Sequence, residues 1–452
     1  MKKHAVNVQS GGETDVHGDK LLSNLVRTEE GVISSRIFTD PEINRLEMER
    51  IFTRSWLYVA HESEIPRPGD FVTRPMGDDS VIVWRGQDGA VRVFLNVCRH
   101  RGMRVCPLDS GKAAQFRCSY HGWTYSNTGE LISVPFFDGY HGNLDKSTHG
   151  LHRAPRVDSY HGLIFANWDE GAESLSDYLG EMKWVMDILF GRTGQLEVVG
   201  SPMRWETDAN WKLGAANFSG DGVHLATTHG FRSALGLQDR ILQGDRINYR
   251  LITENGHGSS LSGFKGKFSL GVPKALQPEV QTRLTEEQLK MLEPLLFVVG
   301  NVFPNMSFLN SGQHTSEEWG GGESEDELVS FLTVRLWQPK GADRMEVWSW
   351  NFVDKNASEQ WKQASRESYL RVFGVAGMFE QDDLENWAGI THALRGPMAR
   401  RLMLQYSKGL GDGPKGRPVP TLKDLVDGGL NEDSERAFYR HWQRLMMQSQ
   451  EG

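Results

Sequence analysis

Cysteine is scarce in this chain, with only Cys98, Cys106 and Cys118 among 452 residues. Three thiols cannot build a disulfide framework, and such sparse use fits a reducing compartment, so we expect a cytoplasmic protein. Long apolar runs are also missing: no stretch approaches the about 18 apolar residues of a membrane-spanning helix. Lys2 and Lys3 are not followed by an apolar run, so we expect no secretory signal peptide and no membrane partner.

The chain also lacks an excess of positive charge. It carries 50 Lys and Arg against 59 Asp and Glu, for a formal net charge of −9. Nucleic-acid surfaces are usually basic, so this balance argues against a nucleic-acid partner. The length is sufficient for two or three domains of ordinary size.

The scarce cysteines lie beside histidines. Cys98-Arg99-His100 is followed, after seventeen residues, by Cys118-Ser119-Tyr120-His121. Two thiolates and two imidazoles are the ligand set of a Rieske [2Fe–2S] cluster, in which the histidines replace two cysteines on one iron. Structural zinc is the alternative for such a set, but zinc fingers order their ligands Cys, Cys, His, His. Cys106 is then left as a buried apolar residue or a redox-sensitive thiol.

Patterns of apolar residues predict the main elements. Residues 56–168 favour short strands and turns, including a hairpin of 81–84 and 91–95, and this small β domain contains all four cluster candidates. Beyond it, we expect helical structure over 211–229, a flexible loop at 256–263 and strands at 303–309, 328–337 and 345–353. Asp40-Pro41 and Thr285-Gln288 read as helix starts, and 358–372 and 380–395 as helices.

A second group of metal-binding residue types follows about a hundred residues later, in the segment that contains Asn217, Asp221, His224 and His229. Two histidines and one carboxylate hold Fe(II) with one face open. The spacing of His224 and His229 does not place both on one face of an ideal helix, so we expect a π-bulge or a break there. Asp221 lies one turn before His224 and is either the third ligand or a carboxylate bound to the other ring nitrogen of a ligand histidine.

The run Glu380-Gln381-Asp382-Asp383 offers another third ligand. On composition alone, such a run indicates a solvated helix N-terminus, where carboxylates interact favourably with the helix dipole. The sequence by itself leaves this choice open.

The two patterns, Cys-x-His-x17-Cys-x-x-His and Asn-Phe-Ser-Gly-Asp-x-x-His-x4-His, occur together in one family. From about residue 31 onward, the chain resembles the large (α) subunit of Rieske non-haem iron aromatic ring-hydroxylating dioxygenases, in particular naphthalene and polycyclic aromatic dioxygenases of the actinobacterial type. The resemblance implies an α+β fold, with a Rieske-type β domain inserted into a catalytic domain that has a large antiparallel sheet and surrounding helices. The expected division is 1–54 for an N-terminal segment and helix, 55–172 for the Rieske domain and 173–452 for the catalytic domain.

The resemblance also implies roles for single residues. The expected [2Fe–2S] ligands are Cys98, His100, Cys118 and His121, and the expected Fe(II) ligands are His224, His229 and Asp383, with Asp383 preferred over Asp382. Asp221 would bridge His121 of a neighbouring subunit to His224, and Asn217 would lie near the iron. The expected substrate pocket contains Phe218, Leu225, Ser233, Val299, Asn301, Phe373 and Phe379.

The activity implied by the resemblance is O2-dependent cis-dihydroxylation of an aromatic ring, such as naphthalene. Electrons would come from NAD(P)H through a reductase and a ferredoxin, and the expected assembly is α3β3 with a small β subunit. The alternatives are an oxygenase for a carboxylated ring such as phthalate, and a monooxygenase or demethylase. A carboxylate substrate needs a buried cation, for which Arg232, Arg240 and Arg246 are candidates. Compared with that family, Gly222 and Val223 stand where relatives often carry an aromatic residue, so we expect a reshaped pocket.

Overall fold

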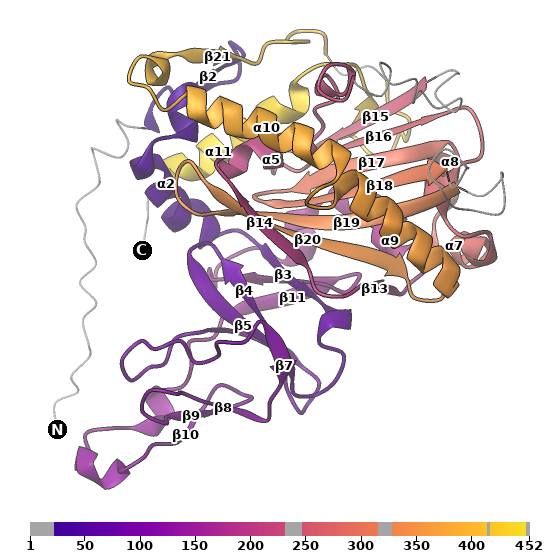
Figure 1. The fold of residues 1–452 in the computed structure, drawn as a ribbon. Coiled ribbons are helices and arrows are strands. Elements are labelled where there is room, and N and C mark those ends of the chain that lie inside the picture. The colour runs from indigo at the N-terminus through magenta and orange to yellow at the C-terminus, as the bar shows by residue number, and fades with distance from the viewer. Residues whose placement is uncertain (1–21, 231–245, 315–327, 414–415, 449–452) are drawn as a thin grey trace.

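The computed structural model describes residues 22–230, 246–314, 328–413 and 416–448. A small all-β body projects from a larger body that is built on one antiparallel sheet (Figure 1). The chain begins in the large body, where β1 (Val26–Arg27) and β2 (Val32–Ser34) pair with β21 (Met403–Gln405). It then forms the small body and returns, so the small body is an insertion, as the expected α+β class requires.

The small body contains three antiparallel sheets. Their strand orders are β6-β5-β4-β7, β10-β9-β8 and β11-β12-β3. The predicted hairpin is confirmed, since Val81 of β5 pairs with Leu95 of β6. Val81, Ile82, Val83 and Trp84 are all buried, which explains the continuous apolar run. The strands are β3 (Leu57–His61), β4 (Asp70–Met76), β5 (Asp79–Arg85), β6 (Val91–Leu95), β7 (Ser110–Lys112), β8 (Gln115–Arg117), β9 (Thr124–Ser126), β10 (Leu131–Ser133), β11 (Arg156–Tyr160) and β12 (Leu163–Asn167).

The large body has a nine-stranded sheet in the order β13-β20-β19-β18-β17-β16-β15-β22, with β14 also paired to β20. The strands are β13 (Leu196–Val198), β14 (Met203–Thr207), β15 (Arg246–Ile252), β16 (Gly258–Phe264), β17 (Leu295–Val302), β18 (Met306–His314), β19 (Leu328–Pro339), β20 (Met345–Asp354) and β22 (Leu425–Asp427). Along β19, Phe331 and Trp337 belong to one apolar core and Leu332 and Leu336 to another. Since side chains alternate along a strand, the sheet separates two cores.

Helices cover both faces of this sheet. On the face that carries Phe331 and Trp337, α5 packs against β17, β18 and β19, α9 packs against β19 and β20, and α10 packs against α9 (Figure 1). The helices are α2 (Pro41–Glu47), α3 (Leu175–Leu179), α4 (Met182–Met186), α5 (Trp211–Phe218), α7 (Gln277–Arg283), α8 (Glu286–Leu292), α9 (Glu359–Phe373), α10 (Met378–Ala393) and α11 (Asp433–Met447).

Most predicted helix starts are confirmed. The Asp40 carboxylate accepts a hydrogen bond from the Glu42 backbone at the start of α2, and Thr285 with Gln288 forms a capping box at α8. Ser358 caps α9, so the helix predicted over 358–372 is present. The helix predicted over 380–395 is α10, which begins two residues earlier, at Met378.

Three predictions about the large body are wrong in part. The strand predicted at 303–309 is present only from Met306, because the residues before it lie in the turn between β17 and β18, which contains a cis Phe303–Pro304 bond. The loop predicted at 256–263 mostly belongs to β16, where glycine permits close packing rather than flexibility: a Cβ at Gly258 would lie 2.4 Å from the Ser219 carbonyl oxygen. The helix predicted over 211–229 ends at Phe218.

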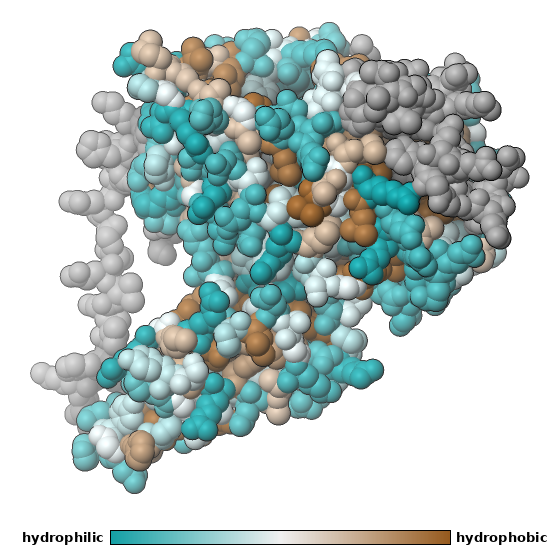
Figure 2. All heavy atoms as spheres, viewed as in Figure 1, coloured by the Kyte–Doolittle hydropathy of each residue, from teal (hydrophilic) through white to brown (hydrophobic). Residues whose placement is uncertain are grey.

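The surface shown in Figure 2 is mainly hydrophilic, and its apolar side chains lie in small separate groups. Among the described residues, none of the helices combines the length and the apolar character needed to span a bilayer.

Candidate functional site

Two loops of the small body repeat the same backbone turn. In each loop a cysteine carbonyl accepts a hydrogen bond from a glycine four residues later, from Gly102 to Cys98 at 2.9 Å and from Gly122 to Cys118 at 3.0 Å. Both glycines have a positive φ, +75° and +74°, which a residue with a Cβ adopts only at a cost. The Cys-x-His and Cys-x-x-His segments therefore fold into matching loops that direct their side chains to one place.

The four side chains of these loops meet at the end of the small body. Cys98 and Cys118 are buried, and the rings of His100 and His121 lie edge to face with 4.5 Å between centroids. Nδ1 of both histidines is buried and has no hydrogen-bond partner among the described residues. Two buried thiols and two unpartnered imidazole nitrogens match the donor set of a Rieske [2Fe–2S] cluster.

Tyr125 of β9 supports this group, and sequence reasoning missed it. Its hydroxyl oxygen accepts a hydrogen bond from the Arg99 backbone at 3.0 Å and lies 3.2 Å from Cys98 Sγ. The hydroxyl proton is therefore free to point at the sulfur. Burial raises the pKa of Cys98, while the hydrogen bond with Tyr125 lowers it. A hydroxyl donor on a cluster sulfur is one of the interactions that tune the reduction potential.

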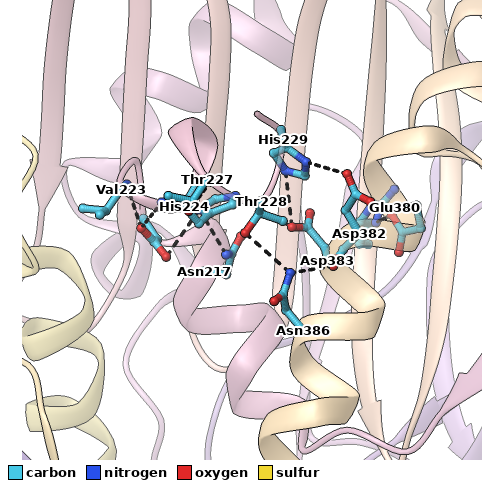
Figure 3. A network of polar contacts seen from close by, with 12 residues as sticks. Asn217, Val223, His224, Thr227, Thr228, His229, Glu380, Asp382, Asp383 and Asn386 are labelled. Carbon is cyan, nitrogen blue, oxygen red and sulfur yellow. Dashed lines mark hydrogen bonds and ion pairs between the residues drawn. The ribbon is translucent and has the colours of Figure 1, made fainter. Parts of the chain in front are cut away.

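The second group lies in the large body, between α5 and α10. His224, His229 and Asp383 each offer one ligand atom, and these atoms all lie within 4.8 Å of one another. Asp383 Oδ1 lies 3.8 Å from His224 Nε2 and 3.3 Å from His229 Nε2 (Figure 3). Two histidines and one carboxylate in this arrangement match the donor set of a mononuclear non-haem iron.

A break in the backbone makes this arrangement possible. After α5 ends at Phe218, Gly220 has a φ of +141°, and a short 3₁₀-helix then runs from His224 to Ala226. His224 and His229 therefore lie outside a continuous helix, as their five-residue spacing predicts. Their side chains converge although α5 would have carried them apart.

Each histidine also has a second carboxylate on its other ring nitrogen. Asp221 Oδ2 lies 3.3 Å from His224 Nδ1, and Asp382 Oδ2 lies 3.5 Å from His229 Nδ1. Among the carboxylates that the structure describes, only Asp383 faces the Nε2 atoms of both rings. The geometry therefore favours Asp383 over Asp382 and Asp221 as the third metal ligand, and it gives the other two carboxylates the outer position that fixes ligand rings.

The Asp221–His224 contact also shifts both pKa values. Burial raises the pKa of Asp221, but the hydrogen bond and charge of His224 and the Val223 backbone N–H outweigh burial and lower it. Burial lowers the pKa of His224, yet Asp221 raises it above its usual value. Asn217 Nδ2 lies 3.4 Å from the same His224 nitrogen, so Asn217 is also next to the site.

The structure places the expected pocket residues unequally. Phe373 and Phe379 stack with centroids 5.7 Å apart, and the Phe379 ring meets the His229 ring edge to face at 4.6 Å. Phe218 packs on Trp337. The remaining members are Val299, which is buried; Asn301, whose amide binds Ser307 and the Pro304 carbonyl; Leu225, which is exposed; and Ser233, which lies outside the described residues.

Comparisons with known proteins match both bodies. Residues 55–147 match the Rieske [2Fe-2S] domain, and residues 183–448 match the ring hydroxylating alpha subunit (catalytic domain). The alpha subunit of biphenyl 2,3-dioxygenase from Rhodococcus jostii is 37% identical, over 95% of this chain and 92% of that protein. The alpha subunit of N,N-dimethyl phenylurea N-demethylase from Sphingobium is 36% identical, over 92% of this chain and 91% of its own length.

A solved structure agrees with these relatives. Naphthalene 1,2-dioxygenase from Rhodococcus sp., bound to indole, superposes with a TM-score of 0.86 and 40% identity, and covers 95% of this chain and 97% of its own. The two family models match one body each, and the relatives and the solved structure cover nearly the whole length. The chain therefore belongs to the family of Rieske-type aromatic ring-hydroxylating dioxygenase alpha subunits.

Proposed function

We propose that this alpha subunit catalyses cis-dihydroxylation of a fused aromatic hydrocarbon of the naphthalene class. The observation that carries the proposal is the stacked pair Phe373 and Phe379 beside His229, where an apolar wall adjoins the proposed iron ligands. A flat hydrocarbon offers no group for a salt bridge, so contact with aromatic faces must orient it. Naphthalene 1,2-dioxygenase, to which the chain is 40% identical, supports this substrate class.

The proposal assigns the metal ligands as the sequence predicts. Cys98, His100, Cys118 and His121 would hold the [2Fe–2S] cluster, and His224, His229 and Asp383 the iron. The proposed domains are 1–54, 55–172 and 173–452. When bound, the cluster supplies single electrons and the iron supplies reductive activation of O2.

The residues around the metals orient their ligands and the substrate. Asp221 and Asp382 would keep the Nδ1 protons of His224 and His229 and leave both Nε2 atoms free for the metal. Phe373 and Phe379 would hold the ring against the open face and exclude water.

Electrons would pass from one subunit to the next. The cluster loops lie at the far end of the small body from α5 and α10 (Figure 1). An open hollow of about 580 Å³ beside Tyr120 and His121 leaves space for another chain. We infer that His121 of the partner subunit contacts Asp221 in a cyclic assembly with small β subunits, and that a ferredoxin and an NAD(P)H-dependent reductase supply the electrons.

Two other reactions remain as candidates within the family. Phthalate oxidation would need a cation in the pocket, but Arg246 is exposed at the start of β15, and Arg232 and Arg240 lie outside the described residues. Demethylation is supported by the similarity to the N,N-dimethyl phenylurea N-demethylase alpha subunit.

A single turnover under isotopically heavy O2 separates these reactions. Chemically reduced protein receives naphthalene, phthalate and an N,N-dimethyl phenylurea, and mass spectrometry identifies the products. We expect a naphthalene cis-diol that contains two labelled oxygen atoms. One labelled atom would indicate monooxygenation, and formaldehyde would indicate demethylation; either result without the diol would refute the proposal.

Two neighbouring variants test the ligand assignment in the same assay. Asp383→Asn should lose iron and all product, because a neutral amide replaces the carboxylate that faces both Nε2 atoms. Asp382→Asn should keep iron and retain part of the activity, since it removes only an outer contact of His229, which typically costs about tenfold. Iron loss in Asp382→Asn alone would reverse the assignment.

A further inference from the structure

A buried ion pair lies next to the proposed iron site, between β19 and the first turn of α10. Arg335 of β19 and Glu380 of α10 form a hydrogen-bonded pair in which both side chains are fully buried. The other end of the same guanidinium donates a hydrogen bond from Nη2 to the Phe373 carbonyl oxygen at 2.7 Å. One side chain therefore joins the central sheet to the end of α9 and to the start of α10.

Both helix ends carry residues of the proposed site. Glu380 lies one turn before Asp383 on α10, so a shift of this turn would move the Asp383 carboxylate. Phe373 is the last residue of α9, and it stacks on Phe379, whose ring meets His229. Arg335 therefore reaches the carboxylate side of the site through Glu380 and the aromatic side through Phe373.

The direction and shape of Arg335 suit this task. Side chains alternate along β19, and Phe331, Arg335 and Trp337 occupy alternate positions on the face covered by α9 and α5. The guanidinium carbon lies 5.1 Å from the Phe373 ring centroid and 5.5 Å from that of Phe218. A planar guanidinium can hold two acceptors in fixed directions at once, whereas a lysine ammonium is a single flexible point charge.

Stability alone does not explain the pair. Two charges lose their hydration on burial, and well-packed apolar residues often stabilise a fold as much or more. Glu380 Oε1 and Arg335 Nε also have no hydrogen-bond partner among the described residues. A buried pair with two unpartnered polar atoms, which joins two segments that both line the site, is better explained by the geometry it imposes.

We propose that Arg335 and Glu380 are positioning residues, which together fix the Asp383 carboxylate and the Phe373–Phe379 wall and so set how the aromatic ring is oriented. The inference rests on the proposed function, because it takes Asp383 as a metal ligand and the two phenylalanines as the pocket wall. Substitutions that weaken the contact between Arg335 and Glu380 should therefore change both the metal affinity and the ratio of regioisomeric products.

The test compares two variants that disturb the pair in different ways. Arg335→Lys keeps the positive charge but loses the planar guanidinium that donates to Glu380 and to the Phe373 carbonyl at the same time. The double variant Arg335→Met with Glu380→Met removes both charges and fills the space with apolar side chains, so the fold should survive even if the single variant is unstable. Arg192→Lys is the matched control, since Arg192 is also a buried arginine, paired with Asp354 and bonded to Asn310 elsewhere in the large body.

Cobalt(II) serves as the metal probe, since its visible absorption reports the ligand set without turnover. Wild-type protein and all variants are stripped of the mononuclear iron with the [2Fe–2S] cluster kept, titrated with cobalt(II) against the cluster absorption as baseline, and melted to obtain Tm. The iron-loaded forms then oxidise phenanthrene, and the ratio of regioisomeric diols and the peroxide released per diol are measured. We expect both pair variants to bind cobalt(II) about tenfold more weakly, with an altered spectrum and isomer ratio. Arg192→Lys should lower Tm and leave the spectrum and ratio unchanged.

The outcomes separate this inference from the function on which it rests. If both pair variants lower Tm but keep the wild-type cobalt spectrum, affinity and isomer ratio, the pair is structural only and the inference is wrong. If wild-type protein binds cobalt(II) but gives no diol, the proposed reaction fails, and the cobalt measurements still decide the positioning role. A wild-type protein that binds no cobalt(II) would overturn both.

Discussion

Glu435 is a carboxyl group in the first turn of α11, buried within the large body. Burial raises its pKa to about 8, the negative charge of Asp221 adds to the shift, and the guanidinium of Arg250 opposes it. Its Oε2 atom has no hydrogen-bond partner among the described residues. At neutral pH this carboxyl group is therefore largely protonated, although an exposed glutamic acid would be ionised.

This raised pKa predicts how stability varies with pH. Between about pH 4.5 and 8 the folded protein keeps a proton on Glu435 that the unfolded chain releases, so stability falls as the pH rises through this range. Glu435→Gln cannot ionise, so it should gain stability over wild type from pH 5 to pH 9, on the order of 3–5 kcal/mol. Urea unfolding of both proteins at the two pH values measures the difference. Parallel stability profiles would contradict the prediction.

Single residues of the site were predictable only where the spacing of residue types in the sequence indicates a particular metal site. The Cys-x-His and Cys-x-x-His spacing identifies Cys98 and Cys118 with their histidines, because few other sites combine these ligands in this order. The choice between Asp382 and Asp383 depends on which helix face points inward, and an acidic run at a helix start is usually solvated. Arg335 carries no sequence signal, since a lone arginine within a strand looks like any other.

At the scale of elements, the lack of a side chain at Gly258 allows the end of α5 to pack closely against β16. A Cβ there would lie 2.4 Å from the Ser219 carbonyl oxygen, just after α5 and before the turn that contains Asp221. Gly258→Ala should therefore destabilise the fold by about 1–3 kcal/mol and slow turnover, because the Asp221 turn must move. Gly389→Ala is the control: outside the adjoining backbone of α10, no described residue lies within 4 Å of its added Cβ, so this helix position should gain about 0.5–1 kcal/mol. Denaturant unfolding measures both, and equal stability of the two variants would contradict the argument.

The elements that the sequence mispredicted have different causes, of which tertiary packing is one. β16 is rich in glycine and serine, and local preference reads such a segment as a loop, whereas β15 and β17 on its two sides make it a strand. The boundary between β17 and β18 was misplaced because Phe303 and Met306 are apolar on both sides of the turn. The starts of α2, α8 and α9, each of which has a side-chain cap, were predicted well, because a cap is a local signal.

At the scale of the whole molecule, the two proposed metal sites belong to different bodies of one chain. The fold class was predictable, because the metal-ligand motifs carry the family resemblance and the family has one architecture. The distance between the sites was not predictable from spacing, since the small body is an insertion whose direction depends on packing against the large sheet. Its projection away from α5 and α10 (Figure 1) is the reason for proposing a relay between subunits.

Mixed assemblies test that relay directly. His121→Ala removes the cluster but keeps Asp221, and Asp221→Asn keeps the cluster and both iron-ligand histidines but interrupts the proposed bridge, so each variant alone should be inactive. Co-expressed in equal amounts, the two chains should recover about a quarter of the wild-type rate, because each working site needs an intact Asp221 and an intact cluster on the neighbouring chain in a cyclic assembly. Variants purified apart and mixed without exchange of subunits should stay inactive. No recovery in co-assembled protein that keeps the mononuclear iron in all chains and the cluster in the Asp221→Asn chains would mean that electrons travel within one chain.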